Sequence, residues 1–180
     1  MDVASIYQRL LAVCQERQVK PNKHALCVSI CEQKLFALTD GQLRKTYAVS
    51  TSRKPPSCVE NSLGTPTGLH VIEEKIGDGL PTGTVLKGRA PTGENCYELD
   101  AERNAENLIT TRILWLRGLE PGANSGAGVD THDRYVYIHG TNQEDRIGQP
   151  NSHGCVLLSN ADVIELFDAT PSGALVWIEL

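Results

Sequence analysis

The sequence predicts a mainly β protein, folded as a sandwich or barrel-like sheet, with a helix at its start and a short helix near its end. Most of the chain after residue 20 consists of short β-branched or aromatic runs separated by glycine- and proline-containing turns. Helical spacing of apolar residues occurs only near the two ends. A chain of 180 residues, 40% of them hydrophobic, is long enough for one substantial core. We therefore expect a helix over residues 1–20 packed on one domain over residues 21–180.

The first 20 residues predict an amphipathic helix. Ile6, Leu10 and Cys14 recur at helical spacing, and Asp2 is placed to cap the helix at its start. A secretory leader would need a basic start followed by an unbroken apolar segment, and this stretch has neither. As written, the chain is therefore expected in the cytoplasm, or in the cell envelope if a native leader precedes it.

The body begins with a predicted hairpin. Residues 25–31 and 34–38 are β-branched or extended runs, and residues 43–50 would return antiparallel to them. Asp40-Gly41 between the last two runs is a pair that two-residue hairpin turns favour.

The second half of the chain contains the least regular segment and the last elements. Residues 118–130 are rich in glycine and predict a long loop, which either borders a binding cleft or is a plain surface loop. Further on, either Ser159 or Asn160 can cap a short helix that carries apolar residues at helical spacing. Residues 174–178 predict the final strand.

Composition limits the partners. A net charge of −5 argues against nucleic acid or an anionic membrane as the main partner. No apolar run approaches the roughly 20 residues of a membrane span. None of the six cysteines forms a CxxC pair or a zinc-finger spacing. Apart from Cys155, we expect them to be small buried hydrophobes or free thiols, as in a reducing compartment.

The segment 135–158 carries the chemistry. A β-rich run ends in His139-Gly140, and a polar spacer leads to Ser152-His153-Gly154-Cys155. Cysteine attacks as the thiolate, so a catalytic thiol needs a neighbouring imidazole or another positive group to lower its pKa from about 8.5. Gly154 allows a sharp bend beside the thiol, and the amides of Gly154 and Cys155 are candidate oxyanion donors. The residue types favour acyl transfer through a thioester.

Two alternatives compete with this interpretation at the level of single residues. His153 lies two positions from Cys155, on the same face of an extended segment, so it rivals His139 as the base. His132, together with these two histidines and the thiol, would be able to ligate zinc. The spacing from His132 to His139 is not that of a metalloprotease helix, so we expect neither metal nor cofactor.

This segment resembles the signature of the L,D-transpeptidases (the YkuD-type catalytic domain), in which a histidine precedes a spacer and a Ser/Thr-His-Gly-Cys turn. The stretches 64–72, 83–89 and 110–116 are also similar to that family. The resemblance implies that Cys155 is the nucleophile and His139 the base. It also implies that the Gly140 carbonyl fixes the imidazole tautomer.

The resemblance further assigns His153 as a hydrogen-bonding residue that shapes the site, with Ser152 as a supporting hydrogen bonder. One position departs from the pattern, because Leu157 stands where the family usually has Arg or Asn. A guanidinium is suited to binding a substrate carboxylate. Three arginines are candidates for carboxylate binding: Arg89, Arg112 and Arg134.

The implied function is a cysteine L,D-transpeptidase acting on peptidoglycan stem peptides. An L,D-carboxypeptidase that hydrolyses muropeptide tetrapeptides would use the same site with water as the acceptor. A third alternative is a catalytically degenerate domain that only binds peptides, for which Leu157 is the one supporting feature. The oligomeric state is not predicted.

Overall fold

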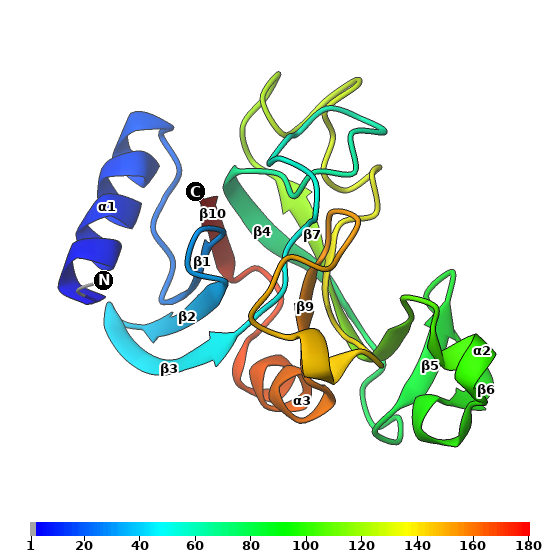
Figure 1. Cartoon of the computed structure of the whole chain (residues 1–180). Helices are drawn as coiled ribbons and strands as arrows, with labels where there is room; N and C mark the ends of the chain where they lie inside the picture. Colours follow the sequence, from blue (N-terminus) through cyan, green and yellow to red (C-terminus); the bar gives the residue numbers. More distant parts are fainter. Residues whose placement is uncertain (1–2) are drawn as a thin grey trace.

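The computed structural model describes residues 3–180 as a curved ten-stranded sheet with helices packed against it (Figure 1). The mainly β fold class predicted from the sequence is confirmed, and Asp2, the expected helix cap, lies outside the described residues. The elements are α1 (Val3–Glu16), β1 (His24–Ser29), β2 (Lys34–Thr39), β3 (Gln42–Ala48), β4 (Gly68–Ile76), β5 (Thr84–Lys87), β6 (Ala90–Asn95), η1 (Cys96–Glu98), α2 (Ala101–Asn104), β7 (Ile109–Gly118), β8 (Tyr137–Gly140), η2 (Glu144–Arg146), β9 (Val156–Leu158), α3 (Asn160–Ala169) and β10 (Leu175–Glu179).

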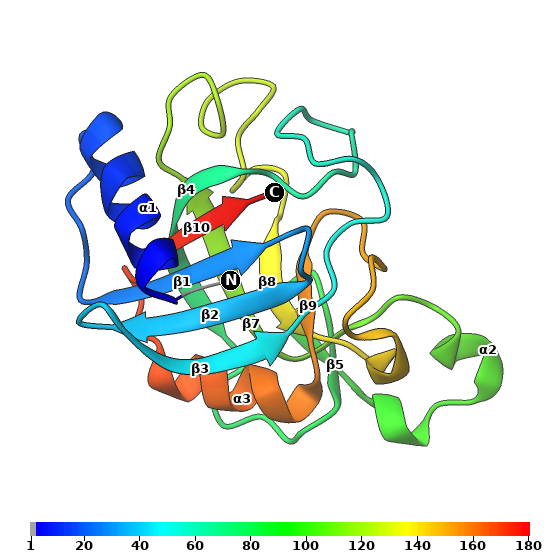
Figure 2. The same ribbon diagram turned by 60° about the vertical axis from the view of Figure 1, so that its left-hand side comes forward.

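The strands follow the order β3-β2-β1-β10-β4-β7-β5-β6, and β8 and β9 branch from β7. Most neighbours are antiparallel, but β1 pairs with β10 and β8 pairs with β9 in parallel. The first parallel pair joins the two ends of the chain, and the second joins the two halves of the motif (Figure 2).

The predicted hairpin forms between β2 and β3. Asp40 and Gly41 are its two turn residues, with φ of 52° and 74°. Positive φ at both positions matches the right-handed twist of the flanking strands, and this is why Asp-Gly pairs favour such turns.

Helix α1 packs on the outer face of the sheet, and its position explains why β1 is apolar on both faces. Leu26 and Val28 face the central core, whereas Ala25 and Cys27 contact the α1 residues of a second core. Successive strand residues point to opposite faces, so a strand covered on both sides loses the usual alternation of polar and apolar residues.

Helix α3 closes the central core from the other side. Ser159 caps it by accepting from the Asp162 amide at 3.1 Å, which decides between the two capping candidates. Val163, Leu166 and Phe167 are buried in the core beneath β7, β8 and β9. The helix therefore supports the strands that carry the His-Cys motif.

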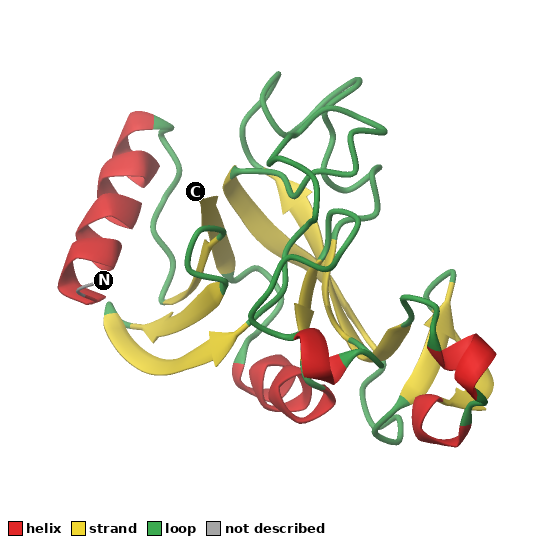
Figure 3. Cartoon of the chain, in the orientation of Figure 1, coloured by secondary structure: helices red, strands yellow, loops and turns green. Residues whose placement is uncertain are grey.

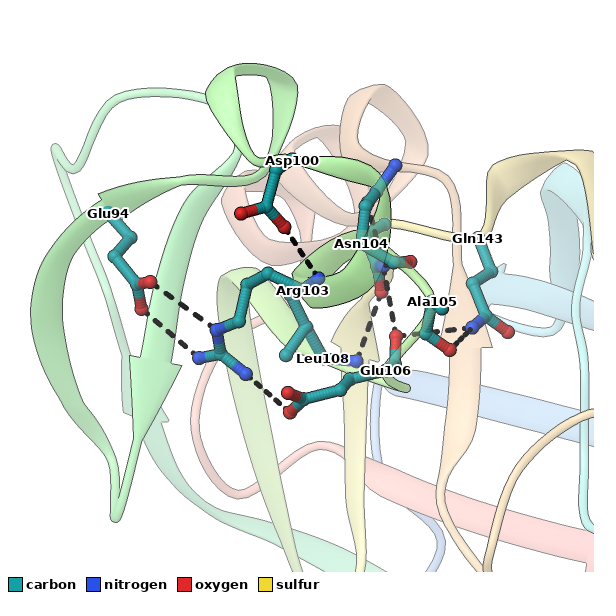
Figure 4. Close-up of polar contacts among 9 residues, drawn as sticks. Glu94, Asp100, Arg103, Asn104, Ala105, Glu106, Leu108 and Gln143 are labelled. Carbon is teal, nitrogen blue, oxygen red and sulfur yellow. Dashed lines mark hydrogen bonds and ion pairs between the residues drawn. The ribbon is translucent and has the colours of Figure 1, made fainter.

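A small lobe, residues 81–107, projects from the body below β7 (Figure 1). The sequence did not predict its short helix α2. Asp100 caps α2, and Arg103 reaches from α2 to Glu94 through two hydrogen bonds and to Glu106 through an ion pair (Figure 4). These contacts are largely exposed, so each adds little to stability, and their role is to hold the lobe together.

The lobe is fastened to the chain that follows His139. Asn142 donates to the Asn104 carbonyl at 2.7 Å and accepts from the Leu108 amide at 3.0 Å. Gln143 donates to the Ala105 carbonyl at 3.1 Å (Figure 4). These hydrogen bonds therefore fix the spacer between the two motif halves to the lobe.

Long loops gather at the opposite end of the molecule from the lobe, where residues 49–67 and 119–136 lie beside each other (Figure 3). Across residues 3–180, all six cysteines are free, and three of them are buried. Within the same range, none of the helices has the length and apolar character that crossing a membrane requires.

Candidate active site

The parallel pairing of β8 with β9 brings the two halves of the motif together. His139 lies opposite Leu157, and Ile138 lies opposite Val156. Parallel neighbours cannot be joined by a tight turn and need a connection of about a dozen residues or more. The spacer 141–155 meets this need, so its length follows from the strand geometry.

Strand alternation decides which side chains face the site. Ile138 and Val156 point into the central core. Tyr137 and His139, one position to either side of Ile138, therefore point to the opposite face. Cys155 stands just before β9 on this same face and packs in a small apolar cluster with Tyr137.

His139 is buried, and one hydrogen bond fixes its tautomer. Its Nδ1 lies 2.7 Å from the Gly140 carbonyl oxygen. A carbonyl can only accept, so Nδ1 carries the proton and Nε2 keeps its lone pair. Burial lowers the pKa of His139 to about 4, and the bond to Gly140 only partly offsets this. The neutral imidazole therefore presents Nε2 as a proton acceptor.

The Cys155 thiol lies between two backbone groups. Its Sγ accepts from the Tyr137 amide at 3.4 Å and donates to the Tyr135 carbonyl at 3.7 Å. Burial raises the pKa of Cys155 to about 11, although the Tyr137 amide and the Arg134 charge lower it. Among residues 3–180, no hydrogen bond joins this thiol to His139. The shifted pKa values of both groups favour a neutral thiol and a neutral imidazole in the resting site.

Ser152 organises the turn that carries the thiol. Its hydroxyl donates to the Cys155 carbonyl at 2.6 Å and accepts from the Gly154 amide at 3.1 Å. The Gly154 amide, expected to be free for an oxyanion, is therefore already occupied. The Cys155 amide, the other oxyanion donor expected from the sequence, does not bond to Ser152.

His153 is exposed at the rim of the site. Its side chain has no hydrogen-bond partner in the described part of the chain, so the structure assigns it no supporting bond. Its position differs from that of His139, which is buried and oriented by a carbonyl.

Two cavities meet at Cys155. The larger has a volume of about 260 Å³ and is lined by Glu60, Arg134 and Tyr135 together with the 153–155 turn. The second, of about 160 Å³, opens toward the lobe and is lined by Asn107, His139 and Cys155 among others. The thiol is thus accessible from both sides.

The glycine-rich loop predicted over residues 118–130 borders this region. Gly126 and Gly128 line a further cavity of about 130 Å³, which shares Glu60 and Arg134 with the larger one. Midway along it the loop is anchored by the buried Asn124, which donates to the carbonyls of Thr67 and Leu69. The loop therefore lies next to the larger cavity without lining it, and Asn124 fixes part of its length.

The three candidate arginines lie in different places. Arg134 lines the larger cavity. Arg89 stacks on the ring of Trp115, with 4.6 Å from its guanidinium carbon to the ring centroid, and reaches the Tyr137 hydroxyl at 3.4 Å. Arg112 is buried and donates to the Leu80 carbonyl at 2.9 Å, away from both cavities at the thiol. The structure thus keeps Arg134 near the nucleophile and removes Arg112 from it.

A bulge in β7 explains the position of Arg112. The β7·β8 register moves from Thr110↔Gly140 to Ile113↔His139, which leaves Thr111 and Arg112 without opposite residues. Thr111 has a φ of 69°, an unfavourable value for a β-branched residue. The bulge turns Arg112 toward the far side of the strand, an outcome that sequence periodicity does not reveal.

Asn160 is a site residue that the sequence suggested only as a possible helix cap. It is fully buried, accepts from the hydroxyls of Thr110 and Thr111, and donates to the Thr141 carbonyl at 3.1 Å. A Cβ placed on Gly140 would lie 2.7 Å from its Oδ1. Asn160 therefore packs directly behind the His139-Gly140 segment, a contact between positions too far apart in sequence for local patterns to indicate.

Leu157 is fully buried in β9 and contributes an apolar side chain to the smaller cavity. His132, a candidate for the zinc alternative, stacks on Trp115 at 4.0 Å between ring centroids. Within residues 3–180, no three His, Cys, Asp or Glu side chains lie close enough together to hold a metal ion.

Comparison with known families and sequences gives a consistent result. The model of the L,D-transpeptidase catalytic domain (YkuD) matches residues 23–178. YkuD of Bacillus subtilis strain 168, a protein that its name assigns to the L,D-transpeptidases, is 34% identical over 126 residues. This alignment covers 68% of the present chain and 66% of the relative. YqjB of the same organism is 42% identical over 48 residues, 27% of either chain.

Solved structures share the fold. An L,D-transpeptidase from Mycobacterium smegmatis superposes with a TM-score of 0.55 at 14% identity, over 88% of this chain and 59% of that one. L,D-transpeptidase 3 from Mycobacterium tuberculosis, in complex with a faropenem-derived adduct, gives 0.56 at 14% identity, over 88% and 60%. The chain thus spans about 60% of the length of these structures and just under two thirds of the Bacillus relative.

Proposed function

The chain belongs to the family of L,D-transpeptidase catalytic domains, and from this premise we propose that it is a cysteine-dependent L,D-transpeptidase of peptidoglycan stem peptides. The observation that carries the proposal is the fixed tautomer of His139. With Nδ1 bound to the Gly140 carbonyl, the unprotonated Nε2 belongs to a ring that lines the same cavity as Cys155. A nucleophile with an oriented base nearby is the arrangement that covalent acyl transfer requires.

In the first step, the Cys155 sulfur attacks the carbonyl carbon of the L-residue in an L,D-peptide bond, and its proton passes to Nε2 of His139. Because both groups are neutral at rest, this transfer accompanies the attack and does not precede it. The Cys155 amide is the proposed donor to the oxyanion. The imidazolium then protonates the leaving amine of the D-amino acid, and a thioester remains on Cys155.

In the second step, an acceptor amine attacks the thioester carbonyl and gives its proton to Nε2. The tetrahedral intermediate expels the thiolate, which recovers the proton. Access to the thiol from two cavities supports this two-substrate reaction, because the acyl donor and the acceptor can approach from different sides. Gly140 and Ser152 have supporting roles in the proposal, and His153 at the rim is a contact for substrate.

The deciding experiment combines the protein with a disaccharide tetrapeptide and follows the products by mass spectrometry. Formation of a cross-linked dimer, or exchange of the terminal D-amino acid, is the result expected of a transpeptidase. Cys155→Ser and His139→Gln should abolish both products. Cys31→Ser, at an exposed thiol that lines neither cavity at the nucleophile, is the matched control and should retain them.

Other outcomes identify the alternatives. Release of the free D-amino acid alone would identify an L,D-carboxypeptidase and refute transfer. A carbapenem provides an independent test, since a solved structure of similar fold, the LD transpeptidase LdtMt1, is in complex with imipenem. We expect a mass increase on the peptide that contains Cys155. Absence of both turnover and adduct would leave a peptide-binding domain.

The proposed substrate also bears on location. A transpeptidase acts where the peptidoglycan polymer lies, in the cell envelope, whereas a carboxypeptidase can act on soluble muropeptides in the cytoplasm. Fractionation of the native organism, with detection of the protein in each fraction, distinguishes these compartments.

A further inference from the structure

Arg134 joins one wall of the larger cavity to the segment that carries Tyr135. Arg134 donates from Nη1 to the Ser57 carbonyl at 3.1 Å, and from Nη2 to the Ser62 hydroxyl at 3.3 Å and the Gly64 carbonyl at 2.9 Å. These three acceptors come from one loop, residues 57–64, which we call the wall loop. These three hydrogen bonds from one guanidinium add to the backbone bonds that the Ser57 amide makes to Thr65 and the Glu60 amide makes to Gly128.

The wall loop lies directly against the turn that carries the nucleophile. A Cβ placed on Gly154 would lie 3.3 Å from the Gly64 carbonyl oxygen, the same oxygen that accepts from Arg134. On the other side, Arg134 precedes Tyr135 in the chain, and the Tyr135 carbonyl accepts from the Cys155 thiol. The guanidinium thus joins two segments that both contact the Cys155 turn.

Arg134 also supplies the permanent positive charge of the site. Among the residues that the structure describes, 3–180, no other lysine or arginine lines either of the two cavities that meet at the thiol. Glu60 and Asp133 line the larger cavity and act in the opposite direction. The histidines, His139 and His153, line the smaller one.

Burial raises the pKa of the neighbouring Tyr137 phenol, so this group is uncharged at neutral pH. The charge of Arg134 lowers the pKa of Cys155, whereas burial raises it. A neighbouring cation is one of the general means by which proteins favour a thiolate. Because Leu157 places an uncharged side chain after the thiol, no cation acts from that position.

The hydrogen bonds of Arg134 limit what else it can do. A guanidinium has five N–H groups, and bidentate capture of a carboxylate uses two parallel ones. Both protons of Nη2 are already donated to the wall loop. Nη2 therefore cannot combine with Nη1 or with Nε to bind a carboxylate through two parallel hydrogen bonds. The geometry argues against Arg134 as a bidentate carboxylate receptor and in favour of a role within the protein.

We propose that Arg134 is a positioning residue of the nucleophile site, which holds the wall loop against the Cys155 turn and places a permanent positive charge beside the thiol. The inference rests on the proposed function in treating Cys155 as the nucleophile. The test measures the reactivity of the thiol without any substrate. Its result therefore does not depend on which reaction the protein catalyses.

The first measurement is the rate of Cys155 alkylation by iodoacetamide as a function of pH, followed on the Cys155 peptide by mass spectrometry. Arg134→Gln should raise the thiol pKa and slow alkylation at pH 7.5 by on the order of threefold to tenfold, a shift of about half to one unit. Arg134→Lys keeps the charge and should stay within about twofold of the wild type. Arg53→Gln, an exposed arginine that lines neither cavity, is the matched control and should leave the rate unchanged.

The second measurement is hydrogen–deuterium exchange in the wall loop. Both Arg134→Lys and Arg134→Gln should exchange faster over residues 57–64, because lysine cannot reproduce three fixed hydrogen bonds. Faster exchange in the lysine variant with a preserved alkylation profile would separate the two roles as proposed.

Several results overturn the proposal. An alkylation profile of Arg134→Gln that coincides with the wild type removes the charge role, and so does a lysine variant as slow as the glutamine variant. Unchanged exchange in the lysine variant removes the positioning role. If the glutamine variant does not fold, Arg134→Lys together with Ser62→Ala, which deletes one acceptor without altering charge, still decides the positioning role by exchange.

Discussion

His70 lies fully buried in β4, and lowering the pH should therefore destabilise the protein through this side chain. Its Nδ1 donates to the Gly68 carbonyl at 3.0 Å, and its Nε2 lies 3.2 Å from the Thr131 hydroxyl. Burial lowers the pKa of His70 to about 4, and the positive charge of Arg134 acts in the same direction. The folded protein thus resists a proton that the unfolded chain accepts.

The sign follows from linkage. The unfolded ring titrates near its model value of 6.5, above the folded value of about 4. The stability that the neutral ring supports is fully present above about pH 6.5 and is lost as the pH falls toward 4. With these two values, we expect a loss of about 2 kcal/mol at pH 5, rising to a limit of about 3.4 kcal/mol below pH 4.

The assay is urea denaturation at pH 7 and pH 5, followed by tryptophan fluorescence, for the wild type and His70→Gln. The wild type should lose about 2 kcal/mol more than the variant between the two pH values, a difference from which the constant cost of the substitution cancels. His24→Gln, at a less buried histidine, is the control and should behave as the wild type does. Equal losses in the wild type and His70→Gln would refute the reasoning.

Three further predictions concern the site and the core. Alkylation of Cys155 in the wild type should accelerate about tenfold per pH unit from pH 7 to 10, because the pKa of the thiol is about 11. A rate that reaches a plateau below pH 8 would contradict a neutral resting thiol. Gly140→Ala should lower the free energy of unfolding by about 1 to 3 kcal/mol in thermal or urea unfolding, because its Cβ would lie 2.7 Å from the Thr110 carbonyl and from Asn160. An unchanged unfolding midpoint would show that the segment shifts to accommodate the methyl group without cost. Leu10→Ala in α1 should lower the free energy of urea unfolding by about 2 to 5 kcal/mol and leave the rate of Cys155 alkylation unaltered. A changed alkylation rate would indicate that α1 affects the site.

Local patterns in the sequence predicted much of the fold. The Asp40-Gly41 turn, the capping of α3 and the strand that ends at His139-Gly140 all depend on neighbours within a few residues, and the structure contains them. The spacing within the motif also carried information, since a parallel strand pair requires a connection of that length. Each of these features depends on chemistry that a short window contains.

Other features depend on contacts between distant segments, and no short window contains them. The position of Arg112 follows from a bulge that forms only when β7 pairs with β8. Asn160 contacts Thr141 and Thr110 across separate elements. The neutral state of the thiol follows from burial in the folded protein, whereas the sequence emphasised only the neighbouring imidazole. Burial and register are properties of the whole fold.

The bulge at Thr111 has a consequence for how this architecture can vary. Strand β7 carries β4 and β5 along one edge and β8 along the other, so a residue added or removed within it would invert the facing of every side chain on the His139 side. The connection between η1 and α2 in the lobe, by contrast, is largely exposed and is paired with neither β8 nor β9. Length changes should therefore be tolerated in the η1–α2 connection and not in β7, so new loops that reshape the lobe side of the entrance belong in that connection and the bulged strand is best left unchanged.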